Sequence, residues 1–198
     1  MKVLKIIVGI LSVPLVIVLC WYMIIYTSLK NPIDEMLYSE ITRFKIVDLP
    51  RYSEVINSDT SYDLRDDGSF VSLHYRLDNI NSREYVSIYV DNFRQFVLSY
   101  KLFLKNNQIL IIENNYEEKN NIKQDVYILT EDRENKIVVS EKFFQILSEN
   151  NLDPKWLREK SSFVLNEILL KPWFDKGSQR YSFENLGNLK IEESTLLK

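Results

Sequence analysis

The chain has 198 residues, of which 45% are hydrophobic and 27% are charged. This is the profile of a globular protein with about one domain and an additional segment. The formal net charge is −3, and no stripe of Lys and Arg stands out, so the electrostatic attraction on which nucleic-acid binding depends has no evident source. Four glycines argue against phosphate-cradling loops and long flexible linkers, and a single cysteine excludes an internal disulfide.

An uncharged apolar segment covers residues 6–26, and its nearest flanking charges are Lys5 and Lys30. At about 1.5 Å per residue, a helix of this length spans roughly 31 Å, which matches a bilayer core of about 30 Å. Thirteen of these 21 residues are Ile, Leu or Val, and aromatic residues gather at the far end, as in an interfacial belt. We therefore predict an uncleaved transmembrane anchor over residues 1–29.

Two other interpretations of this segment fit less well. A cleaved signal peptide has a shorter apolar core that is followed by small residues. A lipidated Cys20 would follow small residues, whereas bulky ones precede it here. Because Lys2 and Lys5 lie before the segment, the positive-inside rule places the N-terminus in the cytoplasm. We expect residues 30–198 to form a single extracellular domain at the cell membrane.

The spacing of apolar residues in this domain changes twice. A helix is predicted to begin at Asn31-Pro32 and to extend toward Phe44. About six strands with short connections follow, over residues 70–76, 84–93, 95–105, 108–113, 124–130 and 136–139. Residues 105–108 are expected to form a hairpin turn, because Asn tolerates a positive φ angle.

Helical spacing returns in the C-terminal part. Ser140 and Asp153 are expected to cap two helices, and the second helix is predicted to run to near Leu170, with Pro172 and Gly177 ending it. A short strand at 189–192 would close the sheet. The predicted fold class is α+β: an antiparallel meander of about six strands with the C-terminal helices packed on one face, preceded by one N-terminal transmembrane helix.

No catalytic or metal-binding pattern is present. The only histidine, His74, has no partner residues at the spacing of a metal site, and the acidic pairs fall where solvated loops are expected. No G-x-S-x-G, P-loop or G-x-G-x-x-G motif occurs. We therefore expect no enzymatic activity, no metal, no cofactor and no small-molecule substrate.

The polar side of the predicted strands is the best candidate for a binding surface. Its residues are His74, Arg76, Tyr85, Tyr89, Asp91 and Lys101. Tyrosine contributes a large contact area at a low cost in rotamer entropy and is enriched at protein interfaces. Ordinary cross-strand pairing on a solvated sheet is the alternative interpretation. As a hypothesis, a protein partner docks on this face.

Two stretches resemble a known family. Residues 31–40 read NPIDEMLYSE directly after the predicted anchor, and residues 177–187 read GSQRYSFENLG. In both stretches, and in its length and layout, the chain is similar to the TipC family of bacterial immunity proteins. The abundance of Asn, Ile and Lys is also typical of an AT-rich Gram-positive genome.

The resemblance implies a function. Such proteins protect streptococci and their relatives from an LXG toxin that a type VII secretion system delivers and that is similar to a lipid II phosphatase. Protection would follow from stoichiometric binding outside the membrane. Basic side chains such as Arg76, Arg94 and Lys101 would then face the toxin's carboxylates, or an acidic inhibitor would meet a basic rim. The alternative is an anchored extracytoplasmic binding module of a sensor or envelope-assembly system, which a gene neighbourhood without an LXG toxin would favour.

Overall fold

The structure is a computed structural model of the whole chain. It describes residues 2–37, 55, 65–66, 70–77, 83–91, 95–117, 120–133, 135–178, 180–192 and 194. Among these residues the helices are α1 (Lys2–Ser28), α2 (Pro32–Leu37), α4 (Glu141–Glu149), α5 (Pro154–Phe163) and α6 (Lys171–Lys176), with a 3₁₀ turn η1 (Lys105–Asn107) and a π-helical segment η2 (Val164–Leu170). The strands are β1 (Arg65–Asp66), β2 (Phe70–Arg76), β3 (Glu84–Asp91), β4 (Phe96–Phe103), β5 (Ile109–Glu117), β6 (Asn121–Leu129), β7 (Lys136–Ile137) and β8 (Lys190–Glu192).

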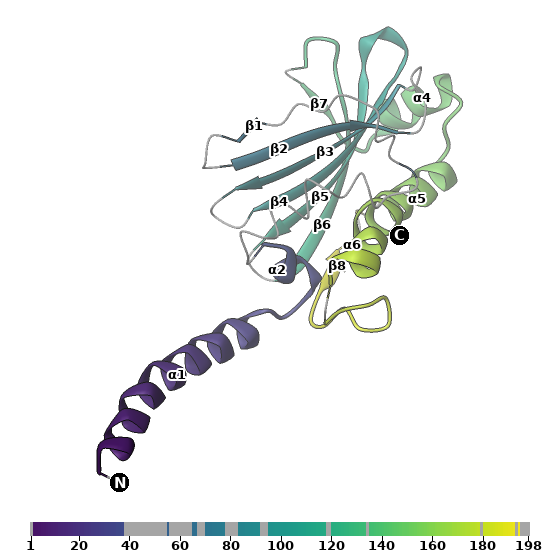
Figure 1. Cartoon of the computed structure of the whole chain (residues 1–198). Helices are drawn as coiled ribbons and strands as arrows, with labels where there is room; N and C mark the ends of the chain where they lie inside the picture. The colour runs from purple at the N-terminus through teal and green to yellow at the C-terminus, as the bar shows by residue number, and fades with distance from the viewer. Residues whose placement is uncertain are drawn as a thin grey trace.

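One sheet contains all the described strands, and helices cover one of its faces (Figure 1). Strands β1 to β7 follow one another in chain order and pair antiparallel, so the predicted meander is confirmed. The short strand β8 pairs with β6 in a parallel direction. A parallel pairing needs a crossover connection, and the helices between β7 and β8 provide it.

Strands β5 and β6 are longer than the sequence predicted. The polar residues Asn114 and Gln124 interrupt the apolar pattern, but both lie inside the sheet-helix interface, 1% and 4% exposed. Gln124 Nε2 donates to Asn114 Oδ1 at 2.7 Å across the two strands. Asn114 Nδ2 in turn donates to the carbonyl of Leu98 at 3.4 Å. Because these buried amides are hydrogen-bonded, the strands continue where the pattern predicted a break.

The predicted turn and caps are confirmed. Asn106 and Asn107 adopt φ angles of 59° and 57° in the turn that joins β4 to β5. The backbone N–H of Phe143 donates to Ser140 Oγ at 3.3 Å at the start of α4. The N–H of Trp156 donates to Asp153 Oδ1 at 2.6 Å at the start of α5. These side chains satisfy N–H groups that a helix start leaves without a partner.

The last helix is longer than predicted: of the two residues expected to end it, Pro172 does not and Gly177 does. The helical path continues from α5 through η2 into α6 and ends at Gly177. In η2 the N–H of Lys171 donates to the carbonyl of Asn166, five residues earlier, which widens the turn. A proline ring collides with the preceding turn of a regular α-helix, and the wider turn before Pro172 explains why the helix continues.

The hydrophobic core lies between the sheet and helices α2, α4, α5 and α6. Strand residues at every second position fill it, including the fully buried Leu73, Val86, Leu98 and Leu110. Helix α5 is also fixed by Lys160, whose Nζ lies 2.9 Å from Glu84 Oε2 and 5.1 Å from the centroid of the Tyr100 ring. This arrangement is the predicted α+β fold.

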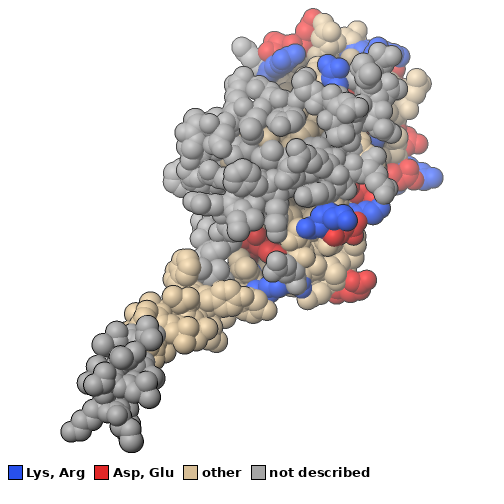
Figure 2. All heavy atoms as spheres, in the orientation of Figure 1, with Lys and Arg blue, Asp and Glu red and all other residues tan. Residues whose placement is uncertain are grey.

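Helix α1 extends away from the domain (Figure 1). Its side chains are described at residues 12–24, 26 and 27, where they are exposed and uncharged (Figure 2). Within the described part of the chain, no helix is long and apolar enough to span a bilayer. The transmembrane part of the predicted fold is therefore not confirmed.

Candidate partner-binding surface

The face of the sheet opposite the helices carries a set of polar side chains in cross-strand register. We call this set the polar ladder; it consists of Ser72, His74, Arg76, Tyr85, Ser87, Tyr89, Ser99 and Lys101. Because side chains alternate between the two faces of a strand, the buried positions between them face the helices. Five of the six residues singled out in the sequence, all except Asp91, thus lie on one surface. Asp91 ends β3, and its side chain lies outside the described set.

The first row of the polar ladder places an aromatic side chain between two basic residues on the neighbouring strands. Tyr85 lies between Arg76 on β2 and Lys101 on β4. The guanidinium carbon of Arg76 is 5.5 Å from the centroid of the Tyr85 ring, a cation–π distance. The ring of Phe103 packs edge-on against Tyr85, with centroids 5.4 Å apart. The row presents a pre-ordered aromatic side chain with a positive charge on each side.

The second row is small and hydroxyl-rich. His74 is paired with Ser87, which in turn is paired with Ser99. Ser72 Oγ lies 3.3 Å from His74 Nε2, within hydrogen-bonding distance. Among the described residues no group of three His, Cys, Asp or Glu side chains converges as a metal site would require. Ser87 and Ser99 are buried, at 8% and 7% exposure, so the accessible hydrogen-bonding groups of this row are at the half-buried Ser72 and His74.

Beside the ladder lies a second apolar cluster that the sequence interpretation missed. Its buried members are Ile109, Ile111 and Tyr127, with Phe103 and Leu129 packed against them. The consecutive apolar residues 109–112 were the available signal, because a strand that is apolar at every position buries both faces. Phe103, at the end of β4, packs against this cluster.

Burial affects the electrostatics of Lys101. The half-buried position lowers the pKa of its ammonium, because the charged form loses hydration, and the nearby Arg133 lowers it further. The carboxylate of Glu113 opposes this shift. Glu113 also accepts a hydrogen bond of 2.9 Å from the Tyr127 hydroxyl. Lys101 is thus a cation held partly out of water beside an aromatic side chain, which is costly for the free protein.

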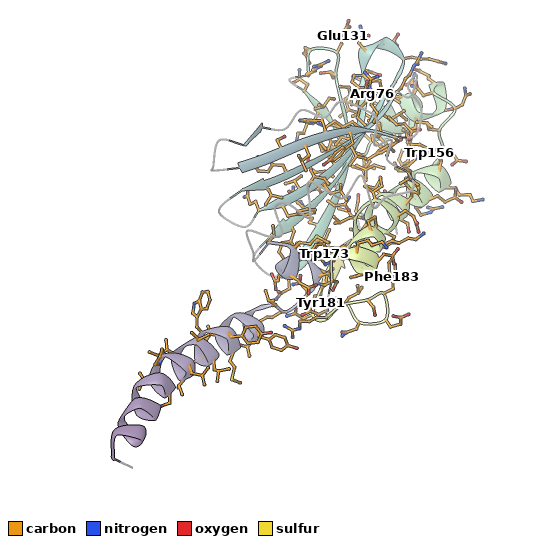
Figure 3. The ribbon with its side chains drawn as sticks, in the orientation of Figure 1. Arg76, Glu131, Trp156, Trp173, Tyr181 and Phe183 are labelled. Carbon is orange, nitrogen blue, oxygen red and sulfur yellow. The ribbon has the colours of Figure 1, made fainter. Side chains whose placement is uncertain are left out.

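The two stretches that resemble a known family meet in space, although the bonded residues Glu35 and Ser178 are 143 positions apart. Ser178 Oγ donates to Glu35 Oε2 at 2.6 Å, and Trp173 Nε1 donates to the same oxygen at 3.3 Å. The Tyr181 hydroxyl donates to the carbonyl of Leu29 at 2.8 Å. Figure 3 shows Trp173, Tyr181 and Phe183 near the C-terminal end of α1, where this helix meets the domain. Arg76 lies toward the opposite end of the sheet.

The start of α2 completes this junction. The side-chain oxygen of Asn31 accepts from the N–H groups of Ile33 and Asp34, both at 2.9 Å, so Asn31 is the helix cap that the sequence predicted. Asn31 is fully buried, and its Nδ2 donates to the Tyr116 hydroxyl and to Asn120 Oδ1, each at 2.9 Å. The two stretches therefore form a polar joint between α1 and the domain.

A solved structure has this fold. The structure is similar to that of TipC2 from Streptococcus intermedius B196, with a TM-score of 0.55 and 16% identity, over 83% of this chain and 95% of that chain. In sequence, the model of the TipC immunity protein-like family matches residues 5–194. The chain belongs to the TipC immunity protein-like family, and the resemblance noted in the two stretches is confirmed. No curated protein matches the chain.

Proposed function

We propose that this protein is an immunity protein that binds and neutralises a type VII-secreted LXG toxin with lipid II phosphatase-like activity. The observation that carries the proposal is the family match over residues 5–194, because membership in an immunity family implies a cognate toxin as the partner. Inhibition by binding needs a rigid, complementary surface rather than a reactive group. The polar ladder, built on central strands of the sheet, has this character.

The toxin-binding surface is the polar ladder, and the row of Arg76, Tyr85 and Lys101 is its centre. Aromatic residues and Arg are the side chains on which binding energy concentrates at protein interfaces. A toxin that uses carboxylates in its active site would present negative charge to this cationic row. Tyr89, two positions along β3 from Ser87, would extend the contact toward the C-terminal end of α1.

The proposed location is the outer face of the cell membrane, with the N-terminus in the cytoplasm. The charge asymmetry around residues 6–26 supports this orientation. Exposed apolar side chains on α1, such as Val16, Ile17 and Trp21, at 54%, 62% and 66% exposure, are consistent with contact with lipid. Lipid II precursor is displayed at that face, so an inhibitor held there would meet the toxin where it acts.

Co-expression with an LXG toxin from the same genome tests the proposal. With the toxin directed outside the cell, the full chain should restore growth and should form a one-to-one complex in a pull-down. Arg76→Ala and Tyr89→Ala should each weaken toxin binding by about tenfold, the size of a hot-spot loss. Lys155→Ala, on the helix side of the domain, is the matched control and should bind normally. Cell death together with no complex formation would reject the immunity function.

Deletion of residues 1–29 tests the proposed location separately. The truncated chain should bind the toxin in vitro but fail to protect cells, because it would remain in the cytoplasm while the toxin acts outside. Protection by the cytoplasmic form would contradict the proposed location and leave the binding function standing.

A further inference from the structure

A pocket of about 280 Å³ with a mixed polar and apolar lining is on the opposite side of the sheet from the polar ladder. It is bounded by α5 and η2 on one side and by β6 and β8 on the other. The residues that line it are Gln124, Arg158, Ser161, Ser162, Leu165, Asn166 and Ile191. The described lining residues include one cation and no carboxylate, so the local charge is positive.

The wall of the pocket contains a buried donor without a partner. Ser161 is 2% exposed, and its Oγ makes no hydrogen bond within the described part of the chain. Leaving a buried hydroxyl unpaired is costly, and the large majority of buried polar side-chain atoms are hydrogen-bonded. An alanine at this position would remove the cost, which indicates that the hydroxyl has another use.

Arg158, at the rim of the pocket, is a cation without a described partner. Arg158 is exposed, one turn before Ser162 on α5, and it forms no hydrogen bond or ion pair with any described residue. Its planar guanidinium matches the geometry of a carboxylate, which it can bind through two parallel hydrogen bonds. Ser162 Oγ accepts from Asn166 Nδ2 at 3.1 Å, and the hydroxyl proton of Ser162 can serve as a further donor.

The parts of the pocket formed by Gln124 and by η2 are rigid. Gln124 is held by its hydrogen bond to the buried Asn114, so the position of its side chain is set by the sheet. Leu165 and Asn166 belong to the π-helical segment η2. Such segments are rare and are frequently found at functional sites, because the widened turn displaces the following side chains. The pocket is therefore preformed rather than a gap between mobile side chains.

We propose that this pocket binds a carboxylate, and that in the cell this group is an Asp or Glu side chain of the partner toxin. The proposal rests on the proposed function for the identity of the partner. Arg158 would pair with the carboxylate at the rim, and the hydroxyls of Ser161 and Ser162 would donate to it from the wall. The toxin would then contact two surfaces of the domain, the polar ladder and this pocket, past the sheet edge at β8.

The first test needs no toxin. Full-length protein in detergent micelles is titrated with N-acetyl-glutamate methylamide, and with the glutamine counterpart as an uncharged control, while backbone amide shifts are followed by NMR. Saturable shifts at residues 158–166 with the glutamate compound alone are expected. Ser161→Ala should weaken binding by about tenfold without lowering the midpoint of thermal unfolding, because it removes an unpaired hydroxyl. The absence of saturable shifts at these residues, or equal shifts with both compounds, would overturn the proposal.

The second test separates this proposal from the proposed function. The toxin affinity of Arg158→Gln is compared with that of Lys155→Gln, an equal loss of charge on the same helix outside the pocket lining. A weakening of about five- to tenfold for Arg158→Gln alone, largest at low salt, is expected. If wild-type protein binds the toxin and both variants bind equally well, the pocket does not contact the toxin while the immunity function stands. If wild-type protein does not bind the toxin, the proposed function itself fails, and only the titration then decides whether the pocket binds carboxylates.

Discussion

The guanidinium of Arg180 stacks on the ring of Tyr26, with its carbon 3.9 Å from the ring centroid, and its Nη1 donates to the Tyr26 carbonyl at 2.6 Å. The same nitrogen donates to the carbonyl of Leu29 at 3.1 Å. The last carbonyls of a helix have no partner within the helix, and a cation there also complements the helix dipole. Arg180 thus caps the C-terminal end of α1 from a loop in the C-terminal part of the chain. This contact fixes the direction of α1 relative to the domain.

Removing this cap should loosen the joint. In Arg180→Ala we expect α1 to sample a wider range of directions. Spin labels at the native Cys20 and at an added Lys176→Cys would report this as a broader distance distribution in pulsed electron resonance. Lys190→Ala, another exposed basic residue of the C-terminal region, is the control and should leave the distribution unchanged. An equally narrow distribution in Arg180→Ala would show that the other contacts of the joint suffice.

Gly187 should tolerate no side chain. Its φ angle is +63°, and an added Cβ would lie 2.2 Å from the carbonyl oxygen of Lys30. We expect Gly187→Ala to lower the free energy of unfolding by about 2–3 kcal/mol, through the left-handed backbone and the displaced joint. Urea denaturation measures this. Asn188→Ala is the matched control: Asn188 contributes its backbone N–H to the Lys30 carbonyl, at 3.0 Å, and the variant keeps that bond. Equal stability of the two variants would contradict the argument.

Tyr116 should matter more for stability than the comparable Tyr127. The Tyr116 hydroxyl donates to Asp34 Oδ1 at 2.6 Å and accepts from the buried Asn31 at 2.9 Å. Tyr116→Phe leaves both groups short of a partner, so we expect a loss of about 2–3 kcal/mol. Tyr127→Phe removes one bond, to the half-buried Glu113, and should cost about 1 kcal/mol. The reverse order in urea denaturation would show that the joint contributes less than the sheet face.

The sequence predicted those features that have a periodic or local signature. Alternation along β2 and β3 separated the helix-covered face from the polar ladder, because every second side chain of a strand shares a face. Ser140 and Asp153 identified their helix starts because capping depends on the three residues that follow. The same local logic placed the turn at Asn106.

Contacts between distant residues have no such signature. Nothing local to Glu35 indicates that Ser178 donates to it, so the joint could be found only in the fold. The pocket has the same origin, because Gln124 and Ser161 come from a strand and a helix that meet only after folding. The direction of β8 also depends on the path of the preceding helices. Sequence reasoning therefore identified one candidate surface and missed the other.

Lys101 should link binding to stability. Burial lowers the pKa of its ammonium below the ordinary value of 10.5, so the folded chain favours the neutral form more than the unfolded chain does. Between the folded and the unfolded pKa the unfolded chain binds more protons, and stability should therefore rise with pH in that window. Below it both states are charged, and the folded state carries the full desolvation cost.

Replacing Lys101 by Met should therefore raise the midpoint of urea unfolding at neutral pH and remove this residue's part of the alkaline rise. The same variant should bind the toxin less tightly, since the cationic row loses one charge. Lys123→Met is the matched control, because Lys123 lies on the same face but is exposed and paired with Asp125 at 2.9 Å. Its removal should leave neutral-pH stability nearly unchanged. The opposite result would be a Lys101→Met variant that is less stable at neutral pH and binds the toxin as tightly as wild type. It would mean that Lys101 stabilises the sheet and does not contribute to toxin binding.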